Sequence, residues 1–134
     1  MGAHTPEEVH DLFRKFMREG DINAVLTLYD REIVFRNRAG EQKRGRDALR
    51  EELAPLAAMK ADFQFTVKRK FESGDMALVQ NEWKLRGPKP QSGYAIEVFC
   101  RRAGMWRFLI GDPYTIGDLQ GANETSRTAL LTTR

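Results

Sequence analysis

The order of the expected elements is the feature that most constrains what this chain can fold into. Helical patterns occupy the first part, and four extended segments joined by tight turns follow from Ala61 to Ile116. Helices followed by a long antiparallel meander favour an α+β fold over a parallel α/β fold. We therefore expect three N-terminal helices packed in a curved, mostly antiparallel sheet that forms a cone with a pocket.

The pattern changes again near the C-terminal end of the chain. From Gly117 onward the sequence is rich in Gly, Asn, Ser and Thr, and no helical or strand periodicity continues. We expect one domain over residues 1–116 and a flexible tail over residues 117–134.

The first helix has clear start and stop signals. Thr5 can cap it, Pro6 suits its first position, and Gly20 is a typical C-terminal stop. Its apolar stripe contains Val9, Phe13 and Met17 but leaves out His10, which we expect in solvent.

Shorter elements lie between this helix and the meander. Asp21 caps a second helix that Tyr29 closes, and a strand from Ile33 to Arg38 turns into a short partner around Gln42–Arg44. A third helix begins near Arg46, and Pro55 ends or kinks it because proline lacks the backbone N–H.

The meander itself predicts a partner for one face of the sheet. Its first strand alternates cleanly from Phe63 to Phe71, whereas the next strand, Met76 to Arg86, is apolar on both faces at its start. Two-sided apolarity is typical of a central strand that a helix or a second subunit covers. We expect a homodimer.

Composition excludes several classes of protein. The 134 residues are 41% hydrophobic and 31% charged, and no apolar run approaches the ~20 residues of a membrane helix. Cys100 is the only cysteine, so no internal disulfide can form, and with no signal peptide visible a cytoplasmic location is expected. Two histidines without Cys or Asp at ligand spacing predict no metal site, and no cofactor motif is visible.

The basic residues bunch at Arg36–Arg46 and at Lys68–Lys70, with a net charge of only +3. Basic side chains on strand faces commonly protect sheet edges. Base stacking would need aromatic residues interleaved with them on an exposed face, and none are. We therefore do not expect nucleic-acid binding.

Several segments together resemble a known superfamily. "TPEEVHDLFRKFMREGDINAVLTLYDREIVF", a short hairpin and "GRDALREEL" resemble the opening of nuclear transport factor 2-like proteins. "GDMALVQNEWKL" and "EVFCRRAGMWRFLIGDPY" are similar to the sheet of the SnoaL-like and ketosteroid-isomerase-like branches. The resemblance covers residues 5–116. It implies a cone around a pocket, in a superfamily of isomerases, dehydratases, polyketide cyclases and non-catalytic association modules, so it does not select a function.

The isomerase-like branch uses a tyrosine, an aspartate base and a protonated aspartate. On this chain the resemblance places the tyrosine at Phe13, the base at Asn37 and the protonated acid at or near Glu97. Phe13 has no hydroxyl, and the Asn37 amide cannot take a proton at neutral pH. The isomerase mechanism is therefore not expected in that form.

Glu97 interrupts an apolar strand and shares a face with Ala95, Phe99 and Arg101. Two interpretations stay open. In one, Glu97 is an inward carboxyl that burial adapts for acid–base work. In the other, it pairs with Arg101 or faces solvent. Asp112, near the end of the last strand, could reach the pocket rim and form an acid pair with Glu97, or could shape the turn.

The remaining candidate site residues are aromatic or polar side chains expected near the pocket. Asn37 could orient a ligand carbonyl or bond its own turn, and the aromatic side chains could stack on a planar ligand or belong to the core. The candidate ligand-binding residues are Phe13, Tyr29, Phe35, Asn37, Asn81, Trp83, Phe99 and Arg101.

Two functions follow from these residues. The first is a SnoaL-like protein that binds a small hydrophobic molecule and could act as a cofactor-independent enzyme of the isomerase or cyclase type. The alternative is a non-catalytic dimerisation module of the same fold, which the loss of the tyrosine and the base favours. The sequence leaves open whether a reaction is catalysed and on which ligand.

Overall fold

The computed structural model describes residues 2–115, which form three helices and one curved six-stranded sheet. The helices are α1 (Pro6–Glu19), α2 (Ile22–Leu26) and α3 (Arg46–Ala58). The strands are β1 (Tyr29–Arg36), β2 (Gln42–Arg44), β3 (Asp62–Ser73), β4 (Met76–Arg86), β5 (Gln91–Arg102) and β6 (Met105–Thr115). The α+β prediction is therefore confirmed, while the expected tail lies outside the described residues.

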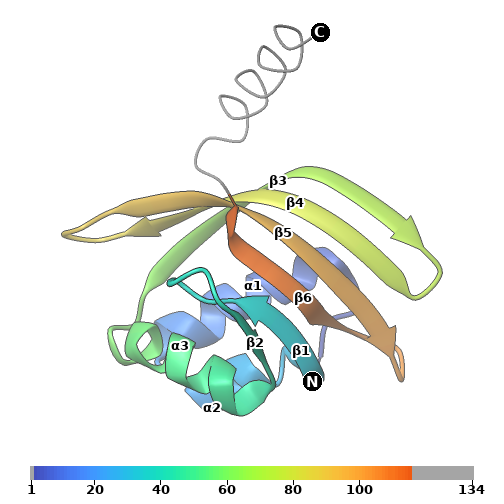
Figure 1. The fold of residues 1–134 in the computed structure, drawn as a ribbon, viewed down its shortest axis with the longest axis horizontal. Helices are drawn as coiled ribbons and strands as arrows, with labels where there is room; N and C mark the ends of the chain where they lie inside the picture. Colours follow the sequence, from blue (N-terminus) through green and yellow to red (C-terminus); the bar gives the residue numbers. More distant parts are fainter. Residues whose placement is uncertain (1, 116–134) are drawn as a thin grey trace, which may run out of the picture.

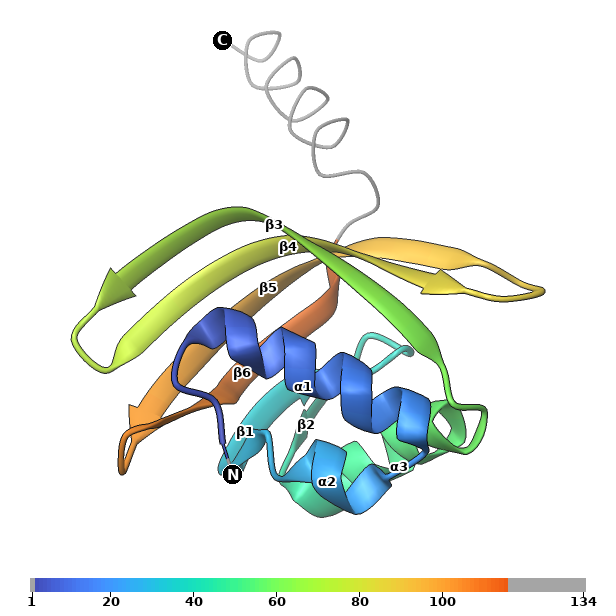
Figure 2. The same cartoon turned by 180° about the vertical axis from the view of Figure 1, so that it is seen from behind.

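The sheet curls around the helices. Its strand order is β2-β1-β6-β5-β4-β3, and every neighbouring pair is antiparallel except β1 and β6, which run parallel. Figure 1 shows the outer face of the sheet, and Figure 2 shows α1 lying across the inner face. The core fills the space between α1, α3 and this inner face.

The termini of α1 form as the sequence predicts. The Thr5 side chain accepts a hydrogen bond from the backbone N–H of Glu8, and Gly20 adopts the left-handed conformation with φ 73°. The prediction for His10 was wrong, because this residue is only 5% exposed. The apolar stripe left it out by residue type, although Pro6, His10, Phe13 and Met17 lie on one buried face of the helix.

Two boundaries also differ from expectation. Tyr29 does not close α2 but opens β1, because α2 ends at Leu26 and the chain is already extended at Tyr29. Pro55 does not end α3, which continues to Ala58. The proline lies in the last turn, where its carbonyl still accepts a hydrogen bond from the N–H of Met59, so the missing N–H interrupts little of the helix.

Among residues 2–115, no helix combines the length and the apolar composition that a membrane span requires.

Gly93 in β5 pairs with Trp83 in β4, and the indole occupies the space that a side chain at position 93 would need. A Cβ atom there would lie 2.7 Å from Cζ2 of Trp83. We predict that Gly93→Ala lowers the free energy of unfolding by about 2 kcal/mol through overpacking, measured by urea denaturation.

Gly111→Ala in β6 is the matched control, because no described atom lies within 4 Å of the Cβ it would add. It should change the stability little. Equal losses in the two variants would show that the Trp83 contact is not the cause.

Candidate functional site

An apolar pocket with a volume of about 100 Å³ lies between the inner face of the sheet and helices α1 and α3. Strand alternation brings the aromatic side chains of β3, β4 and β6 to this face, and the helical stripe of α3 supplies leucines from the other side. Its apolar lining consists of Phe13, Phe35, Leu49, Leu53, Leu56, Phe63, Phe65, Trp83, Leu85, Ala95, Phe108 and Pro113.

Glu97 is the carboxylate on the inner wall of this pocket, and its residue is 9% exposed. Its Oε1 accepts a hydrogen bond from Nδ2 of Asn81 at 2.6 Å and lies 2.7 Å from Nε2 of His10. The expected partner Arg101 is not involved: it lies at the exposed end of β5 and pairs with Asp75. Neither the pairing with Arg101 nor the exposure to solvent that the sequence left open is found.

His10 reaches Glu97 from α1 and is held by aromatic rings. Its imidazole stacks on Phe65 with 4.5 Å between the ring centroids, and Phe99 meets it edge to face at 5.8 Å. The distance between Nε2 and Oε1 is that of a hydrogen bond, which the imidazole donates when Nε2 carries the hydrogen. His10 thereby holds the Glu97 carboxylate in place from the helical side.

Asn81 is fully buried, and its Oδ1 has no hydrogen-bond partner among the described residues. A buried oxygen left unpaired costs free energy, so its retention indicates that the amide has another task. That task is to donate to Glu97. Both hydrogen bonds from described residues end on Oε1, so Oε2 of Glu97 accepts none from them.

Tyr29 and Tyr114 supply hydroxyl groups to the pocket lining. Burial, with further contributions from the charge of Glu97 and from Tyr114, raises the pKa of Tyr29 well above its ordinary value. Burial and the nearby Glu52 also raise the pKa of Tyr114. Both phenols are therefore neutral hydrogen-bond donors near neutral pH.

Arg38 and Glu52 also line the pocket and bring together the turn after β1, helix α3 and strands β5 and β6. Oε2 of Glu52 accepts hydrogen bonds from the backbone N–H of Arg38 at 2.9 Å and from the Tyr114 hydroxyl at 3.5 Å. The Arg38 guanidinium donates to Gln91 and lies over the Tyr114 ring.

The structure places the sequence candidates in three groups. The first group lines the pocket and consists of Phe13, Tyr29, Phe35, Trp83 and Glu97. Asn81 is outside this lining and donates a hydrogen bond to Glu97. Phe99 belongs to the fully buried core. Trp83 is fixed in the wall by a hydrogen bond from its Nε1 to the carbonyl of Pro113.

Three candidates lie elsewhere. Arg101 pairs with Asp75 at the exposed end of β5. Asn37 exchanges hydrogen bonds with Glu41 inside the hairpin turn. Asp112 pairs in the sheet with Ile96, so its side chain lies on the face opposite to that of Glu97. The Asp112 carboxylate forms an ion pair with Arg36 at 3.4 Å. The structure therefore does not bring Asp112 and Glu97 together.

Sequence reasoning missed His10, Arg38, Glu52 and Tyr114. His10 could have been found from its helical spacing to Phe13 and Met17, and Glu52 from its place beside the buried Leu53. No local pattern signals Arg38 or Tyr114, because their contacts join segments that are far apart in the sequence.

The family model of the SnoaL-like domain matches residues 7–110, which decides the family. The chain belongs to the SnoaL-like domain family. Among curated proteins, none has significant sequence similarity to this SnoaL-like chain.

Solved structures share the nuclear transport factor 2-like (NTF2-like) fold. A candidate calcium/calmodulin-dependent protein kinase type II association domain from Thiobacillus denitrificans is 18% identical, with a TM-score of 0.68 over 83% of this chain and 96% of its own. An epoxide hydrolase described as LEH-like, from M. tuberculosis, is 18% identical, with a TM-score of 0.56 over 95% of each chain. A candidate dehydratase of the NTF2-like family from Streptomyces avermitilis is 17% identical, with a TM-score of 0.62 over 79% of this chain and 89% of its own. These similarities show the fold.

The hydrogen bonds to Glu97 predict losses of different size for two substitutions. Glu97→Leu leaves His10 and Asn81 buried without their common partner, so it should lower the free energy of unfolding by about 3 kcal/mol. Glu97→Gln keeps an oxygen that can accept from both neighbours, so it should cost under about 1 kcal/mol. Urea denaturation of the two variants measures this difference, and a similar loss in both would contradict the network.

Proposed function

We propose that this protein binds a small hydrophobic, ring-shaped molecule in the pocket and that Glu97 is its acid–base group, without a cofactor. The observation that carries the proposal is the buried carboxylate of Glu97 on the inner wall of an aromatic pocket, with both of its hydrogen bonds from described residues on one oxygen. Apolar pockets with a few convergent polar groups are the usual form of small-molecule sites.

The cavity volume limits the part of the ligand that is enclosed. An engineered cavity of about 150 Å³ in another protein holds one benzene molecule, whereas this pocket measures about 100 Å³. The enclosed part is therefore no larger than a single ring unless the lining moves.

The chemistry requires a base and a donor in the same pocket. Glu97 supplies the carboxylate, His10 positions it, and Tyr29 supplies the neutral phenol that position 13 lacks. A carboxylate and a phenol can move a proton on a ligand while stabilising a developing oxyanion. This favours an isomerase- or cyclase-type proton transfer. The dehydratase and epoxide hydrolase names among the structural neighbours are compatible with such a pocket.

A screen of single-ring compounds tests the ligand proposal. Compounds that bind should raise the melting temperature of the wild-type protein, because a ligand that binds only the folded state stabilises it. Ala95→Phe places a ring in the pocket and should abolish these shifts. Lys84→Ala, on the exposed outer side of β4, is the control and should preserve them.

Binding that persists in Ala95→Phe would place the ligand elsewhere. If Glu97→Gln keeps ligand binding but loses ligand turnover or deuterium exchange into the bound ligand, the acid–base role of Glu97 is supported. Unchanged exchange in that variant would remove this role.

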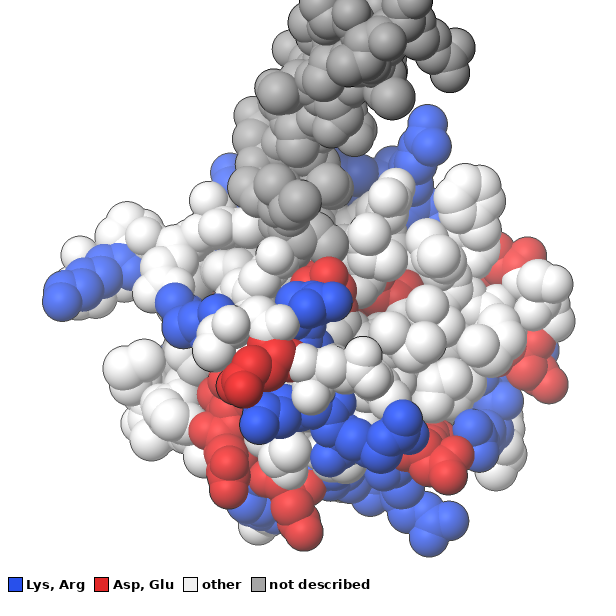
Figure 3. Space-filling view, viewed as in Figure 1, with Lys and Arg blue, Asp and Glu red and all other residues white. Residues whose placement is uncertain are grey.

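The second candidate function is association, supported by the outer face of the sheet. Pairing registers align Phe71, Leu78, Val98, Ile110 and Val34 in one row across five strands. Phe71, Leu78 and Ile110 are 60%, 36% and 47% exposed. Figure 3 shows a largely uncharged area over β4–β6 on this face. An apolar row of this kind fits a second copy of the chain, and a dimer is compatible with a ligand pocket on the other face.

Light scattering at micromolar concentration tests the dimer. We expect the wild type to have twice the mass of the monomer, and Leu78→Glu to be monomeric because it places a charge in the apolar row. Lys84→Glu changes the charge on the same face of the same strand and should remain dimeric. A monomeric wild type would contradict the proposal.

A further inference from the structure

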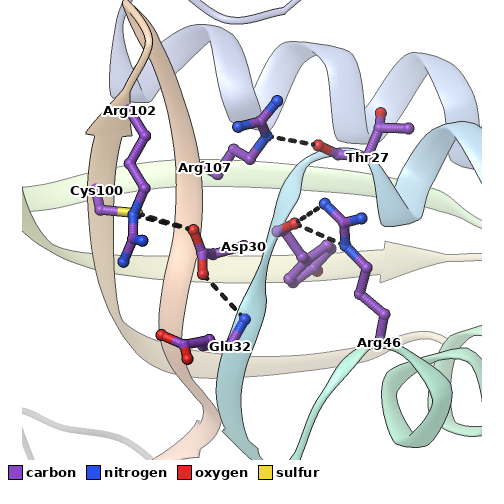
Figure 4. A network of polar contacts seen from close by, with 8 residues as sticks. Thr27, Asp30, Glu32, Arg46, Cys100, Arg102 and Arg107 are labelled. Atoms are coloured by element: carbon purple, nitrogen blue, oxygen red, sulfur yellow. Dashed lines mark hydrogen bonds and ion pairs between the residues drawn. The ribbon is translucent and has the colours of Figure 1, made fainter.

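A second hollow lies on the surface, separate from the lining of the Glu97 pocket. It has a volume of about 460 Å³ and is lined by Asp30, Arg31, Glu32, Arg46, Arg102 and Arg107. These residues come from the start of β1, the start of α3, the end of β5 and the start of β6. The network around this hollow is drawn in Figure 4, where guanidinium groups from three elements surround the first residues of β1.

Two of the arginines are anchored by backbone carbonyls. Arg46 donates from Nε at 3.0 Å and from Nη2 at 2.6 Å to the carbonyl oxygen of Tyr29. Arg107 donates from Nε at 3.2 Å to the carbonyl oxygen of Thr27. A carbonyl positions a guanidinium without neutralising it, so both groups keep their full charge and retain unused N–H donors.

The carboxylates do not balance this charge. Asp30 is buried and already holds Arg102 at 3.2 Å, while its other oxygen accepts the backbone N–H of Glu32. Four arginines and two carboxylates line the hollow, which leaves an excess of two positive charges. Within residues 2–115 the Arg31 guanidinium has no hydrogen-bond or ion-pair partner.

The local backbone accounts for this gathering of charge. The pairing of β1 with β6 shifts register between Tyr29 and Val34. An irregularity of this kind re-aims side chains relative to the regular alternation. Asp30 is consequently buried, while Arg31 and Glu32 are exposed, and all three line the same hollow.

We propose that this hollow binds a phosphate-type dianion, either free phosphate or a phosphomonoester. Arginine forks match the geometry of phosphate oxygens and donate two parallel hydrogen bonds to them. The excess of two charges matches a dianion. The carboxylate of Glu32 disfavours a longer polyanion through repulsion.

Tyr29 connects the hollow to the pocket, although no residue lines both. Arg46 holds the carbonyl of Tyr29 from the hollow, whereas the side chain of Tyr29 lines the pocket. The anion site does not depend on the function proposed for Glu97. Each can fail without the other.

Titration with sodium phosphate, followed by two-dimensional ¹H–¹⁵N NMR of the full chain, tests the site. Sodium chloride at equal ionic strength provides the baseline. We expect saturable shifts at the amides of Arg31, Glu32 and Arg107. Arg31→Gln should weaken binding by about tenfold, because it removes a charge-assisted contact but no contact within the protein. Arg69→Gln, an exposed arginine on β3, should leave it unchanged.

Phenyl phosphate distinguishes the two sources of the dianion. Tighter binding of the ester than of inorganic phosphate identifies a phosphomonoester site, and equal or weaker binding identifies a site for free phosphate. Shifts that sodium chloride reproduces, shifts that do not saturate, or equal weakening in Arg31→Gln and Arg69→Gln would each overturn the proposal. Arg107→Gln provides a second variant, and its retention of full binding would also contradict the site.

Discussion

The hydrogen bonds of Glu97 connect the helical layer to the sheet, and the pocket depends on them. His10 belongs to α1, Asn81 to β4 and Glu97 to β5, so one carboxylate oxygen links three elements in an otherwise apolar interior. A buried carboxylate is tolerated only when its partners compensate for the water it loses. Both of these hydrogen bonds end on Oε1, and the residue also lines the pocket.

Local sequence patterns predicted the fold well because most of its elements are determined by short-range rules. The start and stop of α1, the β1–β2 hairpin and the alternation that places Phe63 and Trp83 inside all follow from short-range rules of capping, turns and strand periodicity. The family of the chain was also recognisable from the whole-length pattern. These features need no knowledge of contacts between distant segments.

The site was predicted only in part, because its chemistry is made by distant contacts. Glu97 was visible as a carboxyl in an apolar strand, but its partner His10 lies 87 residues away and had been expected in solvent. Asp112 seemed able to join Glu97, yet strand pairing places it opposite Ile96 and thereby on the other face. Asn37 was a candidate for ligand contact, but its side chain forms its hydrogen bonds within its own turn. Strand pairing decides the place of Asp112 and helix packing decides that of His10, and single-sequence patterns contain neither.

The parallel pairing of β1 with β6 has a consequence for biosynthesis. β1 and its hairpin partner join the rest of the sheet only through β6, the last described strand. During translation, the β1–β2 hairpin therefore cannot pair with the rest of the sheet until roughly seventy more residues have been synthesised. Closure of this long loop delays the final assembly of the cone. Until then, the backbone N–H and C=O groups on the β6-facing edge of β1 stay unpaired, and an open edge of this kind favours aggregation of the nascent chain.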